Sequence, residues 1–382
     1  MPQVSCVYWQ EYNSINGPVC YCEVAAFDKK LSAQELAKIG CTPEKRRQCL
    51  SLMEAQVGRG TVAATPPAVV TNACNAPKEV ASSHVAIAEN KARSSWLTLV
   101  ILGILAGAYI AFGAEFSTMV THDLAGKVGD GLTRLITGMA FSVGLVMVVI
   151  GGAELFTGNN LMAIGVLQGR VSVGQLLRNW AIVYLANFAG SLAVVGIMYA
   201  TGLWAVNGGL VGAKAVAIAN TKATLSLEQA FFRGIMCNWL VCLAVWLATA
   251  GRDVISKIVG IMLPITAFVA SGFEHSIANM YFIPMGLALK GEPIVLAALA
   301  KAGNISVAQA QASLAGLTWS NFLLGNLLWV TIGNIVGGAI FVGTAYWSVY
   351  LRPTAKAVRA QRAEQAQEGI TVGQGTAAPA AK

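Results

Sequence analysis

An apolar segment near the middle of the chain, Ile258–Leu289, most constrains the fold. Its 32 residues carry one formally charged side chain, Glu274, followed directly by His275. As a straight α-helix the segment would be about 48 Å long, whereas the hydrocarbon core of a bilayer is about 30 Å thick. Gly272 stands beside the two polar residues, and irregular backbone at membrane depth occurs only where it is buried in protein or lines a cavity. The segment is therefore predicted to be a broken membrane helix that lines a transport site.

The composition agrees with a membrane protein. Of the 382 residues, 55% are hydrophobic and 12% are charged, and the mean hydropathy is +0.61. That charged fraction is about half of the value typical of soluble domains. The net charge of +8 does not indicate a nucleic-acid partner, because several Lys and Arg residues flank apolar spans, where they set orientation. The chain is predicted to be a multi-pass integral membrane protein whose solvent is the lipid bilayer.

The N-terminal region differs from the rest. Residues 1–90 are predicted to be a cytosolic extension, partly disordered, with a short helix over 31–57 and a linker over 61–81. Four cysteines of this region are possible zinc ligands: Cys20, Cys22, Cys41 and Cys49. Their spacing does not match a C-x₂₋₄-C pair and no nearby His completes a set, so free thiols are favoured. No metal or cofactor is predicted, and Met1–Glu11 lacks the features of a secretory signal.

The remaining sequence is predicted to hold a membrane domain over 91–352 and a cytosolic tail over 353–382. Six spans are expected, namely 96–116, 135–169, 179–204, 231–250, 258–289 and 320–350. The second has 35 residues and a single charge, Glu154, so it too is expected to break, at Gly151-Gly152 and at Gly158-Asn159-Asn160.

An even number of spans places both termini on one side of the membrane. On that side the flanking basic residues are ten: Lys91, Arg93, Arg170, Arg178, Arg252, Lys257, Arg352, Lys356, Arg359 and Arg362. On the other side they are six: Lys127, Arg134, Lys214, Lys222, Lys290 and Lys301. The bias predicts cytoplasmic termini, in the plasma membrane (the inner membrane of a cell with two).

The two halves of the membrane domain repeat one another. Gly-x-Glu-x₄-Asn occurs from Gly152 to Asn159 and again from Gly272 to Asn279. Asn, Asn and Gly follow at offsets 0, 8 and 11 in the third span, from Asn179, and in the sixth, from Asn326. Because each half has three spans, the second half must insert upside down. Such inverted repeats are typical of transporters whose site lies at the repeat interface.

Three motifs resemble the signatures of the formate/nitrite transporter family. They are Gly151-Gly152-Ala153-Glu154-Leu155-Phe156-Thr157-Gly158-Asn159, Asn238-Trp239-Leu240-Val241-Cys242-Leu243-Ala244-Val245-Trp246, and Gly272-Phe273-Glu274-His275-Ser276-Ile277-Ala278-Asn279-Met280 followed by Pro284. The resemblance covers 96–351. It implies an all-α, aquaporin-like protomer of six spans in an inverted 3+3 repeat, with the second and fifth broken, assembled as a homopentamer with one pore per protomer.

His275 is the central candidate for the substrate pathway. Dry surroundings disfavour the imidazolium, so a neutral resting His is expected, which an arriving anion would help to protonate or which would relay a proton to it. A buried His satisfied by hydrogen bonds is the alternative. Thr157 lies at the other break, where a hydroxyl offers a donor without the desolvation cost of a charge. The resemblance implies that Thr157 faces His275.

The other polar candidates have two interpretations each. Glu154 and Glu274 are expected to be structural carboxylates that accept hydrogen bonds at the breaks, because like charges oppose direct anion binding. Asn238 and Asn334 either join helices or line the pathway. Lys222 is either a solvated lysine in the loop between the third and fourth spans or, as the resemblance implies, a cation that concentrates anions in a vestibule.

Phe141, Leu145 and Phe268 are ordinary packing residues by sequence alone. The resemblance implies that they form two hydrophobic constrictions that exclude water and hydrated ions. The substrates that it implies are formate and nitrite, with protons, or otherwise lactate, acetate or hydrosulfide. A channel for a neutral solute or for water is the second interpretation. An enzyme is disfavoured, because Ser276 directly beside His275 is too constrained to form a nucleophile–base pair.

Overall fold

The computed structural model describes residues 9–14, 17–22 and 74–352, which belong to two compact units that divide after Thr71. In the first unit, strand β1 (Trp9–Ser14) pairs antiparallel with β2 (Gly17–Cys22), with Trp9 opposite Cys22. The helix expected over 31–57, Cys41, Cys49 and the tail from residue 353 lie outside the described residues.

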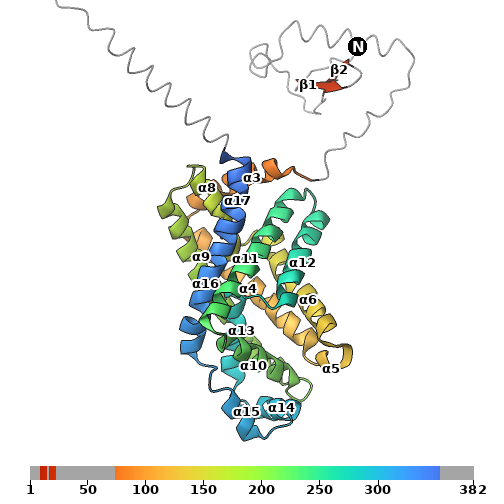
Figure 1. Ribbon diagram of the computed structural model, residues 1–382, viewed down its shortest axis with the longest axis vertical. Coiled ribbons are helices and arrows are strands. Elements are labelled where there is room, and N and C mark those ends of the chain that lie inside the picture. The colour runs from red at the N-terminus through yellow and green to blue at the C-terminus, as the bar shows by residue number, and fades with distance from the viewer. Residues whose placement is uncertain (1–8, 15–16, 23–73, 353–382) are drawn as a thin grey trace, which may run out of the picture. The chain divides into compact units, whose positions relative to one another are not determined.

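The second unit is a bundle of helices (Figure 1). Its helices are α3 (Pro77–Arg93), α4 (Trp96–Thr121), α5 (Ala125–Val128), α6 (Asp130–Gly151), α7 (Phe156–Asn159), η1 (Asn160–Met162), α8 (Ala163–Leu167), α9 (Val173–Thr201), η2 (Leu203–Ala205), α10 (Leu210–Ala223), α11 (Leu227–Ala250), α12 (Val254–Ser271), α13 (Ser276–Leu289), α14 (Pro293–Gly303), α15 (Val307–Ser313), η3 (Asn321–Leu327), α16 (Leu328–Ile335), η4 (Val336–Thr344) and α17 (Ala345–Tyr350).

The six predicted spans are confirmed. Within the residues that the structure describes, six helical segments are long and apolar enough to cross a bilayer: α4, α6, α9, α11, α12 and the continuous run from η3 to α17. The third span begins at Val173 instead of Asn179, because the side chain of Ser172 accepts a hydrogen bond from the Gln175 amide and caps the helix. Within the sixth span, η3 and η4 are π-helical, a local widening that the sequence pattern did not indicate.

Both predicted breaks are present. Helix α6 ends at Gly151 and α12 ends at Ser271, and the glycines that cap them, Gly152 and Gly272, adopt left-handed backbone with φ of 75° and 79°. A short irregular stretch follows each glycine before α7 or α13 begins. At Asn160, where a second break was expected in the second span, the chain instead narrows to a 3₁₀ turn, η1.

Glycines allow the spans to approach closely within one chain. A methyl group on Gly107 would lie 2.0 Å from the Asn187 carbonyl oxygen, and one on Gly190 would lie 2.0 Å from that of Ile104. These contacts join α4 to α9. In the second half, methyl groups on Gly333 and Gly337 would lie 2.2 Å from carbonyl oxygens of α11. Each half therefore packs its first span against its third through glycine, as the repeat requires.

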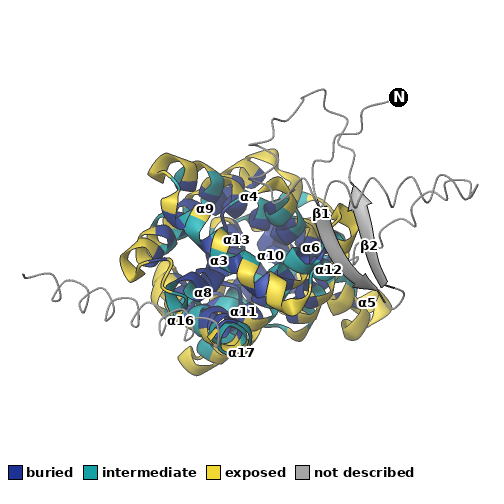
Figure 2. Ribbon diagram, turned by 90° about the horizontal axis from the view of Figure 1, so that it is seen from above, coloured by how far each residue is buried: buried dark blue, intermediate teal, exposed yellow. Residues whose placement is uncertain are grey.

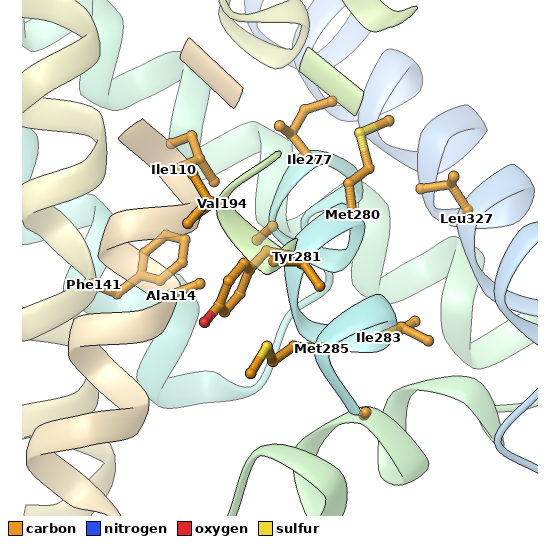
Figure 3. Close-up of a cluster of buried hydrophobic side chains, with 14 of the residues drawn as sticks. Ile110, Ala114, Phe141, Val194, Ile277, Met280, Tyr281, Ile283, Met285 and Leu327 are labelled. Carbon is orange, nitrogen blue, oxygen red and sulfur yellow. The ribbon is translucent and has the colours of Figure 1, made fainter. Parts of the chain in front are cut away.

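The core lies where α13 meets the surrounding spans. Figure 2 shows buried residues gathered toward the centre of the bundle and exposed ones on its rim. In Figure 3, Phe141 of α6, Ala114 of α4 and Tyr281 of α13 lie together in this core. Large apolar side chains are exposed on the outer surface, for example Leu185 at 66% and Ile255 at 69%. Such a rim is expected of a protein whose outer surface contacts lipid or neighbouring subunits.

The two ends of the bundle differ. Helix α3 and the end of α17 lie at one end, and α10, α14 and α15 lie at the other (Figure 1). The linker predicted over 61–81 is wrong from Pro77 onward, because Pro77 opens α3 and Val80 and Ala81 are fully buried in the bundle. The boundary expected after residue 90 thus falls inside α3, and the compact unit begins at Asn72.

Candidate functional site

The two helix breaks meet at Thr157 and His275. Both side chains are buried, and the Thr157 hydroxyl oxygen lies 2.9 Å from His275 Nε2. On the other side of the ring, Nδ1 accepts a hydrogen bond from the Ala278 amide at 3.0 Å, so that His275 caps the N-terminus of α13. Because Nδ1 accepts, the neutral ring carries its proton on Nε2 and donates it to the Thr157 hydroxyl. The hydroxyl proton of Thr157 remains free to serve as a donor.

A polar cluster holds the first break. Asn159 donates its side-chain amide to Glu154 at 2.7 Å and to the Asn179 side chain at 2.8 Å. Asn187 donates to the Glu154 carbonyl at 2.9 Å and accepts from the Phe156 amide at 3.0 Å. The other carboxylate oxygen of Glu154, Oε1, forms an ion pair with the Lys91 ammonium group of α3 at 2.5 Å.

The second break has the same cluster. Asn279 donates to Glu274 and to the Asn326 side chain, both at 2.7 Å. Asn334 donates to the Glu274 carbonyl at 3.0 Å and accepts from the Ser276 amide at 2.9 Å. Lys222 pairs with Glu274 at 2.8 Å. The contacts match the first cluster one for one. Each carboxylate lies at a break, accepts a hydrogen bond from an asparagine side chain and pairs with a lysine.

Asn238 and Asn334 make contacts that favour the helix-joining interpretation. The Asn334 side chain also donates to the Gly234 carbonyl at 2.8 Å, which completes its donors and its acceptor. Asn238 donates to the Asn334 carbonyl at 2.7 Å, to the Asn160 side chain at 2.8 Å and to the Thr157 carbonyl at 3.2 Å. Asn238 therefore fixes α7, which presents the Thr157 hydroxyl to His275.

Two cavities approach the site from opposite ends of the bundle. The α3 vestibule, about 520 Å³, is lined by Lys91, Glu154 and Leu145 among others. The α10 vestibule, about 540 Å³, is lined by Lys222, Glu274, His275, Phe141 and Phe268 among others. Thr157, Asn238 and Asn334 line neither of these two cavities.

The three residues that the resemblance implies as constrictions lie at the walls of the two vestibules. Phe141 and Phe268 contact each other edge to face with ring centroids 5.7 Å apart, and Phe268 stacks on His275 at 5.9 Å. Leu145 follows Phe141 by one helical turn on α6 but lines the opposite cavity. All three are at most 3% exposed. Phe141 and Leu145, about one turn or about 5 Å apart along α6, therefore line different cavities.

Lys222 does not lie in a loop. It occupies the last turn of α10, which packs along α13, and its ammonium group lies 5.4 Å from the centroid of the Phe282 ring. The ion pair with Glu274 and this aromatic contact hold it at the wall of the α10 vestibule. The alternative of a solvated loop lysine is therefore wrong.

Lys91 is a site residue that the sequence pattern did not single out, because it also flanks an apolar span. The sequence spacing indicates that Lys91 is the counterpart of Lys222. Lys91, Ser95 and Gly103 have the same spacing along the chain as Lys222, Ser226 and Gly234. Ser95 and Ser226 both cap the first span of their half. Gly103 and Gly234 both give their carbonyl to an Asn of the third span in that half. The repeat thus includes α3 and α10.

Comparison with known proteins shows which family has this sequence and architecture. A family model described as "Formate/nitrite transporter" matches residues 78–348. The chain is 44% identical over 292 residues to a "Probable formate transporter" of Methanothermobacter thermautotrophicus, an alignment that covers 72% of this chain and 97% of the relative. It is 38% identical over 264 residues to "Formate channel FocA" of Escherichia coli K12, covering 69% and 90%.

Solved structures give the same result. A "Pentameric formate channel with formate bound" superposes with a TM-score of 0.59 at 41% identity, covering 67% of this chain and 98% of that one. An "FNT family ion channel" superposes with a TM-score of 0.57 at 31% identity, covering 71% and 98%. The region that the family model matches, 78–348, includes both breaks.

Proposed function

The chain belongs to the formate/nitrite transporter family, and from that premise we propose that it conducts formate across a membrane through a pore in each protomer of a homopentamer. The observation that carries the proposal is the pair of vestibules, each with a lysine at its wall, that end on opposite sides of one apolar barrier beside His275. The activity is transport without a catalytic step. Nitrite is the second substrate of the proposal.

The apolar barrier explains why protons belong to the mechanism. A bare anion between Phe141, Phe268 and Leu145 has an electrostatic cost of several kcal/mol even after relaxation. A neutral acid avoids that cost, but formic acid is scarce at neutral pH. We therefore propose that the anion is neutralised beside the barrier, where His275 and the Thr157 hydroxyl are the available donors.

His275 supplies the proton in this proposal. Its neutral ring cannot give up the Nε2 proton without becoming an imidazolate, so a proton must first enter at Nδ1. Nδ1 accepts a hydrogen bond from the Ala278 amide, and protonation of Nδ1 breaks this bond, which caps α13. The imidazolium is therefore a transient state. The Nε2 proton then passes to the anion through the Thr157 hydroxyl, which keeps one proton throughout. The ring is left neutral with its proton on Nδ1, and uptake of a proton from water at Nε2 with release of the Nδ1 proton restores the resting tautomer.

The membrane setting completes the proposal. The protein is a multi-pass membrane protein, and we propose a plasma-membrane location with both termini in the cytoplasm, from the ten basic residues against six near the span ends. The α3 vestibule then opens to the cytoplasm and the α10 vestibule to the outside. Native mass spectrometry of the detergent-purified protein should show a pentamer, and a dominant monomer or tetramer would contradict the assembly.

Uptake by proteoliposomes tests the function. Labelled formate, nitrite and lactate are supplied separately, with and without an inward pH gradient. Formate uptake should exceed that of protein-free liposomes and rise with the gradient. Uptake of lactate without formate or nitrite would show that the substrates are larger acids. Swelling of the proteoliposomes through entry of water or glycerol, without anion uptake, would favour the neutral-solute channel.

A further inference from the structure

The α10 vestibule holds more positive charge than its acidic side chain neutralises. Four basic residues line it, Arg134, Lys214, Lys222 and Arg233, together with one acid, Glu274. Lys222 is committed to Glu274 at 2.8 Å. The other three make no ion pair with any residue that the structure describes. Four cations less one carboxylate leave a charge of +3 at this mouth.

The unpaired cations surround the break that carries His275. The backbone carbonyl of Arg233 accepts the Glu274 amide at 3.2 Å, which fixes α11 beside this break. The Arg134 guanidinium donates to the Ala270 carbonyl at 3.4 Å, two residues before Gly272 of the break. Burial lowers the pKa of Lys214, and nearby Arg134 acts in the same direction while Asp130 opposes it. An anion in this cavity therefore meets positive charge next to the site.

The inverted repeat shows that Arg233 is an addition to the framework. In the first half, the carbonyl of Leu102 accepts the Glu154 amide at 3.1 Å, as that of Arg233 accepts the Glu274 amide. The two halves share their lysine, glutamate and asparagine contacts, yet one has Leu where the other has Arg. Within the described part of the chain, the Arg233 side chain makes no hydrogen bond that holds helices together. Its charge is not needed for the fold.

An arginine in such a place fits a carboxylate. The planar guanidinium presents paired donors that match the two oxygens of a carboxylate, and a partly enclosed positive cavity raises the local concentration of anions. We propose that Arg233, with Arg134 and Lys214, forms a carboxylate-binding site in the α10 vestibule that captures the anion before it reaches His275. This inference rests on the proposed function. By the same count the α3 vestibule carries +2, from Lys91, Arg252 and Lys257 less Glu154, so the α10 mouth, at +3, should bind formate more tightly than the α3 mouth.

Currents through single pentamers in planar bilayers test the site. Sodium formate is added to one chamber at a time at low ionic strength, and the half-saturating concentration is measured from each side. The wild-type protein should saturate at a lower concentration from one side. Arg233→Leu, which places the residue of the first half in the second, should raise that lower value about fivefold and leave the maximal current within about a factor of two.

Three controls sharpen the test. Arg233→Lys keeps the charge without the paired donors, so its shift should be about half as large on a logarithmic scale. An ionic strength of about 0.5 M should remove most of the Arg233→Leu effect, because screening acts within a few ångströms at that concentration. Lys257→Gln, in the α3 vestibule, should shift the value measured from the opposite side.

An unchanged half-saturating concentration in Arg233→Leu, or equal shifts from both sides, would contradict the carboxylate-binding site. The proposal that the protein conducts formate would not be affected by that result. Should Arg233→Leu fail to assemble as a pentamer, Arg233→Lys decides, and a value equal to that of wild type would then count against the carboxylate fit. A wild-type protein that carries no formate current would instead contradict the proposed function, and the capture site would fall with it.

Discussion

At the scale of single residues, the Lys222–Glu274 ion pair is largely closed to solvent, with the side chains 16% and 4% exposed. Removal of one charge from such a pair leaves the other buried and unpaired, which costs more than the pair itself contributes. Lys222→Met should therefore lower the free energy of unfolding by about 3 kcal/mol. The double variant Lys222→Met/Glu274→Gln should recover most of the loss, because no charge is then left alone.

Thermal denaturation of the detergent-purified pentamer measures these differences. Lys91→Met provides the matched control in the first half, where the lysine is 23% exposed, and it should cost less. A double variant as unstable as Lys222→Met would show that the lysine stabilises the protein by a route other than its charge.

The sequence predicts which residue types form the site better than it predicts which of them are in contact. An ionisable pair inside an apolar segment identified Glu274 and His275, and the repeat identified Glu154 as the counterpart of Glu274. The Thr157–His275 contact joins positions 118 residues apart, and only the resemblance indicated it. Lys91 and Arg233 were not singled out, because a basic residue near the start of an apolar span is also the ordinary mark of membrane orientation.

At the scale of elements, α3 is the helix that the sequence pattern misjudged. Its composition is that of a polar, solvent-exposed helix, and its partners lie far along the chain. His84 stacks on Trp246 at 5.2 Å, and Asn75, just before α3, donates to the Thr249 carbonyl at 2.9 Å. Alternation of short apolar and polar residues does not reveal such long-range packing, whereas the long spans were evident from hydropathy.

The docking of α3 should weaken as the pH falls. His84 is 3% exposed, and burial, with a smaller effect of Lys91, lowers its pKa to about 4 from 6.5. Above pH 6.5 the ring is neutral whether α3 is docked or released, so it has no effect on docking. As the pH falls from 6.5 to 4, the released helix binds a proton and the docked one does not, so docking loses about 3 kcal/mol in total.

Hydrogen exchange of the α3 amides, corrected for intrinsic rates, should then be roughly 30-fold faster at pH 5 than at pH 7.5. His84→Phe keeps the stack on Trp246 without a titrating group and should remove this difference. An equal acceleration in His84→Phe would assign the pH response to other groups.

Deletion of the first compact unit and deletion of α3 should have different effects on formate flux. We propose that a chain starting at Asn72 assembles and conducts formate as the full chain does, because it retains α3 and Lys91. A chain starting at Ser94 should lose at least half of its formate flux, since Glu154 is left without its cation at the α3 vestibule. Proteoliposome uptake at matched protein density measures both, and loss of flux in the longer chain would assign the first unit a part in conduction.

At the scale of the whole molecule, the repeat determined more of the architecture than any single motif did. Three spans in each half, related by inversion, account for the six crossings, the two breaks and the shared end of α3 and α17. The short helices α10, α14 and α15 were not predicted, because they are too short to produce a span-like apolar run. Between 17% and 50% of each span's most apolar window is buried in one chain, which leaves a wide surface for lipid and for neighbouring protomers.

The pH dependence of formate uptake by His275 variants tests the central claim most directly. Uptake is measured at several external pH values in proteoliposomes with the membrane potential clamped, for wild type, His275→Phe and His275→Asn. His275→Phe should abolish uptake at neutral pH with the pentamer intact, because both the donor and the proton carrier are lost. His275→Asn keeps a donor and should conduct anion down a voltage gradient without the wild-type pH dependence. Wild-type pH dependence retained in His275→Asn would remove His275 from the proton path.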